Sequence, residues 1–474
     1  MSKLDQVSKK AFSYLFHIVL SLLLIDWAVK LPGDVGGIGI YEIVFVLLGV
    51  VSLVRLYFEK GKILQNTVSV LRTSKWSIVA LATYLLFGFV TLFYAQTPSY
   101  AMTKYIVVVQ MLFFGMCLFY YIPAHKDGPD AALKKIYFNI GISAVVSALW
   151  ALCKYLLFPS GKYAAIISPV DDYNQYSTIL LIGWICAATY ISRKPVSATK
   201  KNVLLAVFSG LLLPMVLVSG SRRSYVIAYV ISAAMLLLAV YFTIKAFSKK
   251  CEKTTLRTTI CTMLICVLCV TLTSKILTYT VDTLSRLPAT GTVTPDDSPQ
   301  HPSVDSPGSA QDRLNSESGL GKRKHIWAVA IQEIQKFDAV EFLIGKGASH
   351  SSDIYDDLAN PAVKDIHESY GYSENCVAEK NWMNSHNLFL QDMLDGGLLL
   401  LLAQLSMIFA AVFYTLRIIR LNPINGIALL LMYGILLVTL FLSPARGMLS
   451  NKFLWIITML QTSECYILKP TNKS

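Results

Sequence analysis

Long uninterrupted apolar segments recur along almost the whole of this 474-residue chain. A helix of about 20 apolar residues, rising 1.5 Å per residue, is long enough to cross the hydrocarbon core of a bilayer. Backbone polar groups find no water inside a bilayer, so such segments must satisfy their own hydrogen bonds as helices. Twelve segments qualify, and they lie at 11–29, 38–56, 76–95, 104–122, 136–158, 174–191, 202–219, 224–244, 256–274, 387–416, 424–442 and 447–464. The sequence therefore predicts an all-α polytopic membrane protein with about 12 transmembrane helices.

The composition agrees with a membrane protein. Hydrophobic residues make up 54% of the chain and charged residues only 15%, whereas soluble proteins are nearer a quarter charged. The net charge of +13 raises the alternative of a nucleic-acid-binding protein. The positions of the basic residues decide between the two.

Lysines and arginines concentrate on one side of the predicted membrane. If the N-terminus is cytoplasmic, the inner segments hold 24 of the 42 basic residues, whereas the short outer segments and the helix bodies hold 8. The remaining 10 lie in one long outer loop, and long loops have little influence on orientation. We therefore expect both termini to be cytoplasmic and membrane lipids to surround the spans. The charge excess needs no nucleic-acid partner.

The predicted topology divides the chain into four parts. Residues 1–274 hold nine transmembrane helices, 275–385 form the large outer loop, 386–464 hold three more helices, and 465–474 form a cytoplasmic tail. Within the loop, the Pro-rich residues 288–312 cannot bury a core, so we expect them to be disordered.

The outer loop also contains an amphipathic segment, at 323–337. One face of the predicted helix is apolar and consists of Ile326, Ala330, Ile334 and Phe337. We expect this helix to lie on the membrane surface or to pack on the helix bundle. The Gly-Lys-Gly turn at 345–347 is expected to end it.

Cations at the outer face are candidates for binding an anionic substrate. Arg222 and Arg223 are adjacent at the outer start of the eighth span, where free backbone N–H groups and the helix dipole also favour a phosphate. Arg446 precedes the last span, and Lys104 is a weaker candidate at the start of the fourth. The alternative for these residues is anchoring in lipid headgroups. Arg323 opens the amphipathic loop segment, where its local sequence favours a solvated surface charge.

His386 stands at the outer mouth of the tenth span and is followed by Asn387. A single interfacial histidine is more often structural than catalytic, but the Asp-Gly-Gly at 395–397 makes this neighbourhood unusual. Metal binding finds little support, because no two histidines have the H-x-x-x-H spacing and most adjacent acidic pairs lie in the loop. We expect neither a metal nor another cofactor.

Four motifs, in this order and on one side of the membrane, resemble the O-antigen ligase and polymerase superfamily of bacterial inner-membrane glycan transferases. They are S-G-S-R at 219–222, R-x-x-I-W at 323–327, F-L-I-G-K-G at 342–347 and H-N-x-x-L-x-x-x-L-x-x-G at 386–397. Each motif alone is weak, whereas their order and sidedness together are fairly specific. The N-terminal half of the chain resembles the superfamily only in hydropathy.

The resemblance implies a GT-C-like fold and a transfer reaction at the periplasmic face of the inner membrane. The donor would be a glycan carried on undecaprenyl pyrophosphate, and in the ligase branch the acceptor would be a sugar hydroxyl of the lipid A core. His386 would be the general base that deprotonates this hydroxyl. The displacement would invert the anomeric centre and would need no metal.

The resemblance also implies where the donor binds. Arg222 and Arg323 would hold its pyrophosphate, because arginine offers permanently charged, bidentate donors. From their positions in the sequence alone, Arg223 and Arg446 are also predicted to bind the pyrophosphate, and Asn387 and Lys104 to support the site.

Three other functions stay open. An O-antigen or capsule polymerase would use a lipid-linked glycan as acceptor, but the R-x₁₀-G pattern of one well-known polymerase type begins at neither Arg222 nor Arg323. A protein O-oligosaccharyltransferase is a third relative with similar motifs. A transporter of lipid-linked glycans would carry charges at mid-membrane, where these spans are nearly uncharged.

A chain-length regulator is a candidate partner for the Pro-rich segment.

Overall fold

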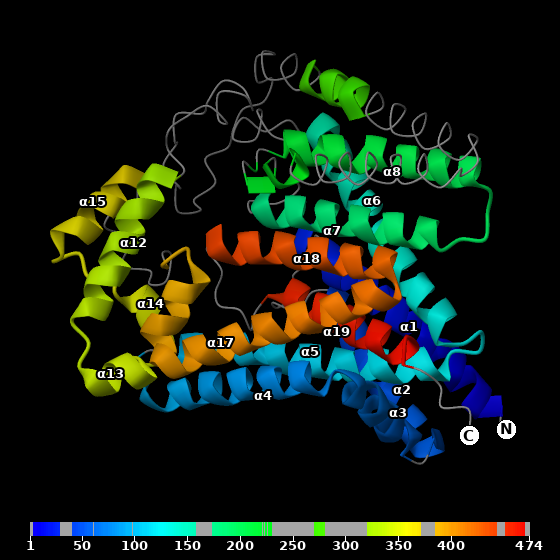
Figure 1. The fold of residues 1–474 in the computed structure, drawn as a ribbon, viewed down its shortest axis with the longest axis horizontal. Helices are drawn as coiled ribbons and strands as arrows, with labels where there is room; N and C mark the ends of the chain where they lie inside the picture. The colour runs from blue at the N-terminus through cyan, green and yellow to red at the C-terminus, as the bar shows by residue number, and fades with distance from the viewer. Residues whose placement is uncertain are drawn as a thin grey trace. The chain divides into compact units, whose positions relative to one another are not determined.

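The computed structural model describes residues 3–28, 40–59, 61–96, 98–157, 173–219, 221, 223–224, 226–229, 270–279, 320–370, 384–442 and 451–469. The elements in this part of the chain are α-helices and two short 3-10 helices, and it contains no strand (Figure 1). The prediction of an all-α protein is confirmed.

Eight helices among the described residues are long and apolar enough to cross a membrane. They run over Lys3–Ile25, Tyr41–Glu59, Lys62–Tyr94, Tyr105–Ala124, Pro129–Leu157, Lys200–Val218, Leu388–Leu421 and Pro423–Leu442. Each coincides with a predicted span, in agreement with a multi-pass membrane protein.

Four predicted spans are not among these eight. The segments 174–191 and 447–464 correspond to helices α7 (Tyr173–Ser192) and α19 (Lys452–Ile467). The predicted spans 224–244 and 256–274 lie mostly outside the described residues.

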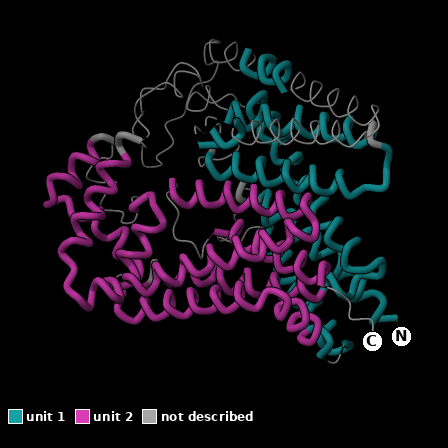
Figure 2. The backbone as a smooth tube through the Cα atoms, in the orientation of Figure 1, with its two compact units in different colours: residues 1–63, 121–290, 307–314 teal, residues 64–120, 291–306, 315–474 magenta. Residues whose placement is uncertain are grey.

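The chain forms two compact units (Figure 2). Unit 1 consists of Met1–Ile63, Tyr121–Thr290 and Pro307–Leu314, and unit 2 consists of Leu64–Tyr120, Gly291–Ser306 and Asn315–Ser474. Unit 1 contains α1 (Lys3–Ala28), α2 (Ile40–Glu59), α6 (Pro129–Leu157), α7 and α8 (Ala198–Val218).

Small residues allow the helices of unit 1 to pack closely. A Cβ atom added to Gly183 of α7 would lie only 2.1 Å from the Cβ of Ala144 in α6. Lipid provides no hydrophobic driving force between helices, so this kind of close van der Waals contact holds a membrane bundle together. The buried Arg55 of α2 is paired with opposite charge, because it contacts Asp5 of α1 and Glu59.

Unit 2 has α17 (Leu388–Leu421) at its centre. Most of α3 (Lys62–Leu71), α4 (Lys75–Val90), most of α5 (Pro98–Ala124), α18 (Pro423–Leu442) and α19 also belong to it. Helix α17 packs against α4, α18 and α19. The candidate site lies at its N-terminal end.

The helices of the predicted outer loop gather at that N-terminal end of α17 (Figure 1). They are α12 (Leu320–Gln335), α13 (Ala339–Ile344), α14 (His350–Asp353) and α15 (Pro361–Tyr370). Three of them, α12, α13 and α14, contact α17, whereas α15 packs on α12. The loop and the last three helices therefore belong to one unit.

The amphipathic loop helix is present, and apolar residues of its stripe are buried against other residues of the loop. Helix α12 runs over Leu320–Gln335 rather than 323–337, and Ile326 and Ala330 are fully buried. Ile326 belongs to a small core with Val329, Tyr355, Val363 and Ile366. Helices α12 and α15 thus form a core of their own.

The prediction that the Gly-Lys-Gly turn at 345–347 ends this helix was wrong. Helix α13 intervenes, because Asp338 starts a new helix by accepting hydrogen bonds from the N–H groups of Val340 and Glu341, each at 2.8 Å. The Glu341 carboxylate accepts in return from the N–H of Asp338 at 3.1 Å, which completes a capping box. The Pro-rich residues 288–312 lie outside the described residues.

Candidate functional site

His386 precedes α17 in a strained backbone conformation. Its φ is 48°, in the left-handed region, which costs an L-residue about 1–2 kcal/mol. Neighbouring polar groups fix this geometry. The His386 N–H donates to Asn384 Oδ1 at 2.9 Å, and Ser385 Oγ donates to the Asn387 carbonyl at 2.9 Å. Strain of this kind is concentrated at functional sites.

Asn387 is the N-cap of α17. Its Oδ1 accepts from the N–H groups of Phe389 at 3.0 Å and Leu390 at 3.3 Å. Two of the unsatisfied donors of the first turn are thereby satisfied. The supporting role expected of Asn387 therefore has a physical basis, since it sets where the helix begins directly after His386.

The imidazole of His386 is kept neutral. Its Nδ1 is buried and has no hydrogen-bond partner among the described residues. Burial lowers the pKa of His386, and the positive charge of Arg323 lowers it further, to about 4. At neutral pH the ring therefore carries one proton and one free lone pair, so it can accept a proton from a bound molecule.

Arg323 lies in the first turn of α12 and is partly buried. Trp327, four residues later, is on the same face of the helix. The Trp327 ring contacts Phe441 at the end of α18, with ring centroids 5.6 Å apart, and Phe441 contacts Phe389 of α17 at 6.2 Å. This aromatic bridge directs the Arg323 face of α12 towards the start of α17. The structure thus brings two predicted site residues together, although they are distant in sequence.

Two glycine turns, Gly345–Gly347 after α13 and Gly396–Gly397 within α17, meet further along α17, and we call them the glycine clasp. The N–H of Lys346 donates to the Leu394 carbonyl and that of Gly347 to the Asp395 carbonyl, each at 3.0 Å. A Cβ on Gly345 would lie 2.5 Å from the backbone nitrogen of Gly396, so no larger residue fits. Both Gly345 (φ 71°) and Gly347 (φ 101°) have left-handed backbones. The clasp joins two motifs that the sequence resemblance treats separately.

Helix α17 changes direction at the clasp. Gly397, inside α17, has φ 61° and ψ −159°. These non-helical angles interrupt the helix about three turns after His386. A Cβ at this position would lie 2.5 Å from the backbone nitrogen of Gly345. The kink and the loop turn therefore depend on each other.

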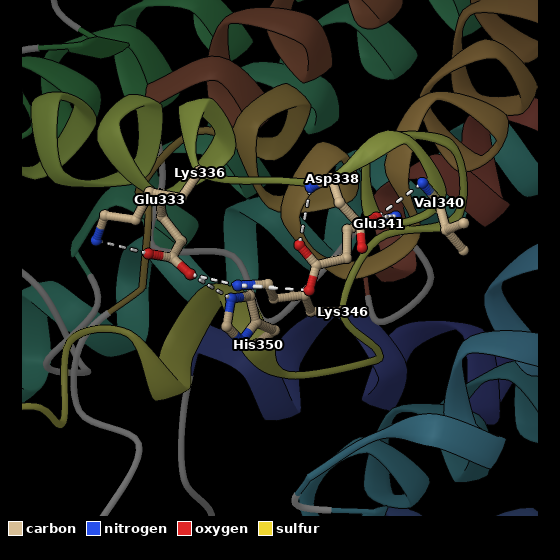
Figure 3. A network of polar contacts seen from close by, with 7 residues as sticks. All are labelled: Glu333, Lys336, Asp338, Val340, Glu341, Lys346 and His350. Carbon is tan, nitrogen blue, oxygen red and sulfur yellow. Dashed lines mark hydrogen bonds and ion pairs between the residues drawn. The ribbon is translucent and has the colours of Figure 1, made fainter.

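A charged network connects α12 to the clasp (Figure 3). The carboxylate of Glu333 accepts hydrogen bonds from Lys346 Nζ at 2.8 Å and Lys336 Nζ at 3.2 Å, and His350 Nε2 lies 3.4 Å from it. Burial alone would raise the pKa of Glu333, but the two lysines outweigh it and hold the pKa at about 2. Burial lowers the pKa of His350 against the opposing charges of Asp395 and Glu333. The network is therefore an ionised carboxylate between cations and a neutral histidine.

Two acids of α17 complete the surroundings. Asp395 Oδ1 accepts from the N–H of Ser351 at 2.8 Å, and Asp392 Oδ2 accepts from Tyr84 OH of α4 at 2.6 Å. Sequence reasoning missed Glu333, His350 and Asp392. Asp392 had a usable signal, because an acid one turn inside an apolar helix is rare unless it has a partner.

The other predicted cations are not joined to this pair in the described structure. Arg222 and Arg446 lie outside the described residues, and so does the side chain of Lys104, whose backbone belongs to α5. Arg223 belongs to unit 1, where it is buried and donates to the Asn174 carbonyl at 3.0 Å. Their roles in binding pyrophosphate stay predictions.

Among the described residues, no three His, Cys, Asp or Glu side chains come together as a metal ion would require. The groups described at the N-terminal end of α17 include a neutral histidine and, near enough to lower its pKa, the permanent cation of Arg323. No protein-family model and no curated protein matches this chain.

Proposed function

We propose that this protein is a glycosyltransferase of the O-antigen ligase type. It transfers a polysaccharide from undecaprenyl pyrophosphate to a sugar hydroxyl of the lipid A core at the periplasmic face of the bacterial inner membrane. The observation that carries the proposal is the neutral His386 beside Arg323 at the mouth of a candidate membrane span. A proton acceptor and a permanent cation are the two groups that this transfer requires.

The proposed reaction is a single displacement. The acceptor oxygen bonds to the anomeric carbon of the donor sugar while the bond from that carbon to the pyrophosphate oxygen breaks. The bonding electron pair leaves with the pyrophosphate, and His386 takes the acceptor proton. Arg323 offsets the growing negative charge. The contributions of Arg222, Arg223 and Arg446 to the same task stay predictions from the sequence. The configuration inverts, and a product NMR spectrum with retained configuration would contradict this step.

Donor binding would strengthen the base. With a pKa of about 4, His386 is a weak proton acceptor in the free protein. An anionic pyrophosphate beside Arg323 would offset the charge that lowers this pKa. The pKa of His386 would then rise from about 4, while burial, the larger cause of its low value, would still hold it below the ordinary value. Donor binding would thereby make His386 a stronger base.

The full proposal includes twelve spans in a GT-C-like arrangement, with both termini cytoplasmic. Support comes from one end of unit 2. Tyr94 OH at the end of the third span donates to the Ile344 carbonyl at 2.6 Å, and the N–H of Ala348 donates to the Thr91 carbonyl at 3.1 Å. Residues assigned to the outer face thus meet at one end of the helices, as the proposed sidedness requires.

The base is tested with purified full-length protein in liposomes, using lipid-linked glycan as donor and lipid A core as acceptor. His386→Ala should lower turnover at least about 100-fold, because general base catalysis contributes on that order. The thermal transition should show that the variant still folds. His325→Ala is the matched control, since that exposed histidine is two residues from Arg323, and it should keep its activity. Full turnover by His386→Ala would refute the proposed base. Because the proposed reaction uses no metal ion, turnover should also persist when EDTA removes divalent metals.

The acceptor is tested in cells. In a strain lacking this protein, we expect lipopolysaccharide with bare core and long polymer still attached to undecaprenyl pyrophosphate. Core capped by a single repeat would instead identify a polymerase.

A further inference from the structure

Helix α13 exposes large apolar side chains, although it is only one and a half turns long. Val340 is 63% exposed, Phe342 45% and Leu343 44%. No residue of α13 is buried. Neighbouring exposed apolar side chains of this kind mark a surface that binds a protein or a membrane.

The helix is held in place at both ends, so this exposure is a property of ordered structure. The Asp338 capping box closes its start, and the N–H of Gly345 donates to the Glu341 carbonyl at 2.7 Å at its end. Tyr94 OH, which donates to the Ile344 carbonyl at 2.6 Å, ties α13 to the 3-10 helix η2 (Thr91–Tyr94).

The exposed residues of α13 adjoin the end of a membrane span. The 3-10 helix η2 is the last turn of the candidate span Lys62–Tyr94, and Phe93 within it is 78% exposed. Phe89 and Val90, in the turn before it, are also exposed. The exposed apolar residues of α13 therefore lie next to those at the end of a candidate membrane span, and Figure 1 shows α13 beside the end of α4.

We propose that α13 is an interfacial anchor that places Val340, Phe342 and Leu343 among the lipids of the outer leaflet. The partner is the bilayer surface itself, because the exposed apolar residues of α13 adjoin the end of a candidate span whose own exposed apolar residues would face lipid. Helix α12 is not the anchor, since its stripe packs against α15. The anchor would hold the loop helices, and with them Arg323, at a fixed depth at the membrane surface. This inference does not depend on the proposed reaction.

The test uses photo-crosslinking in the full-length protein. Benzoylphenylalanine is introduced in place of Phe342, and the protein is reconstituted in vesicles of phosphatidylethanolamine and phosphatidylglycerol. Phe409, exposed on α17 within a candidate span, serves as the lipid-facing control. Lys336, whose side chain is 66% exposed on the same loop, serves as the water-facing control. After irradiation, mass spectrometry measures the fraction of protein that carries a lipid.

We expect the yield of lipid adduct at Phe342 to approach that at Phe409 and to exceed that at Lys336 at least fivefold. A yield no higher than at Lys336 would overturn the proposal. A crosslinked dimer as the main product would also overturn it, because a second copy of the chain would then cover the patch. If the Phe342 variant does not fold, the same probe at Leu343 gives the same two outcomes.

Discussion

At the residue scale, Arg323 and His386 are coupled by charge. The positive charge of Arg323 disfavours a second positive charge on the imidazole, so removing it should raise the pKa of His386 from about 4. For Arg323→Ala we predict that the acidic limb of kcat/KM moves to higher pH by about half a unit or more. Overall activity should also fall, since the pyrophosphate of the donor loses a positively charged binding partner.

The charge-conserving variant separates these two effects. Arg323→Lys should keep the acidic limb near that of the wild type, because a cation remains in the first turn of α12. Lys324→Ala removes the exposed neighbouring cation and should change neither the limb nor the activity. An acidic limb that stays in place in Arg323→Ala would mean that burial alone sets the pKa of His386.

Asn387 gives a second prediction at the scale of single residues. Its side chain satisfies two donors at the start of α17, so Asn387→Ala should destabilise the protein by about 1 kcal/mol. Asn387→Ser can still cap the helix and should retain most of the stability. The melting temperature in detergent measures both. If Asn387→Ser keeps its stability but loses turnover, Asn387 also contacts substrate.

At the element scale, the glycine clasp joins α13 to α17 through backbone alone. Gly345→Ala would place a methyl group 2.5 Å from the backbone of Gly396 and would force a left-handed φ on alanine. We predict a melting temperature at least about 5 °C lower, because either the turn or the α17 kink must shift. Gly434→Ala in α18 is the control, since nothing lies within 4 Å of its added Cβ. Equal stability of the two variants would show that the clasp yields easily.

The Glu333 network should make the loop sensitive to acid. The folded-state pKa of about 2 lies below the ordinary 4.5, so the folded protein favours the ionised carboxylate. Its contribution to stability should be complete above about pH 4.5 and should disappear as pH falls towards 2.

We therefore predict that Glu333→Gln melts a few degrees below the wild type at pH 7 and that this difference shrinks at pH 3. Lys336→Met is the control, because an exposed partner contributes little. A difference in melting temperature that does not change with pH would show that Glu333 acts through packing rather than charge.

At the scale of the whole molecule, the membrane spans could be predicted from the sequence because the ability of a segment to cross a bilayer depends only on its own length and composition. Length and hydropathy within one segment predicted twelve spans without knowledge of their partners, and eight of them coincide with candidate membrane helices in the described part of the chain. Helix α13 was missed because six residues carry no readable period, although Asp338 and Glu341 have the spacing of a capping box. The contacts of Glu333 with Lys346 and His350 depend on how α12 lies over α17, and no local pattern contains that information.

The candidate site also has a part that the sequence could predict and a part that it could not. His386 and Arg323 could be singled out because a cation and a histidine at the mouths of helices break an apolar pattern. Their proximity was implied only by a resemblance, since 63 positions separate them in the chain. Their proximity depends on how α12 packs against α17 and α18, as in the contact of Trp327 with Phe441, and this belongs to tertiary packing.

The position of the C-terminus tests the whole topology. Helix α19 has 16 residues, about 24 Å, which is short for a complete crossing. It nevertheless runs antiparallel to α18, because Glu464 near its end accepts from Asn425 near the start of α18 at 2.9 Å. Earlier in α19, Thr458 contacts Tyr433, further along α18, at 3.3 Å. The C-terminus should therefore emerge on the side where α18 begins.

The turn before α18 follows Arg417 and Arg420, which predicts that this side is cytoplasmic. A fluorescent protein that matures only in the cytoplasm should therefore fluoresce when fused after Ser474. Alkaline phosphatase, active only outside the cytoplasm, should be active when inserted within 288–312 and inactive after Ser474. Phosphatase activity at the C-terminus would mean that α19 does not return across the membrane. Inactivity within 288–312 would place the loop in the cytoplasm and His386 with it, out of reach of a periplasmic acceptor.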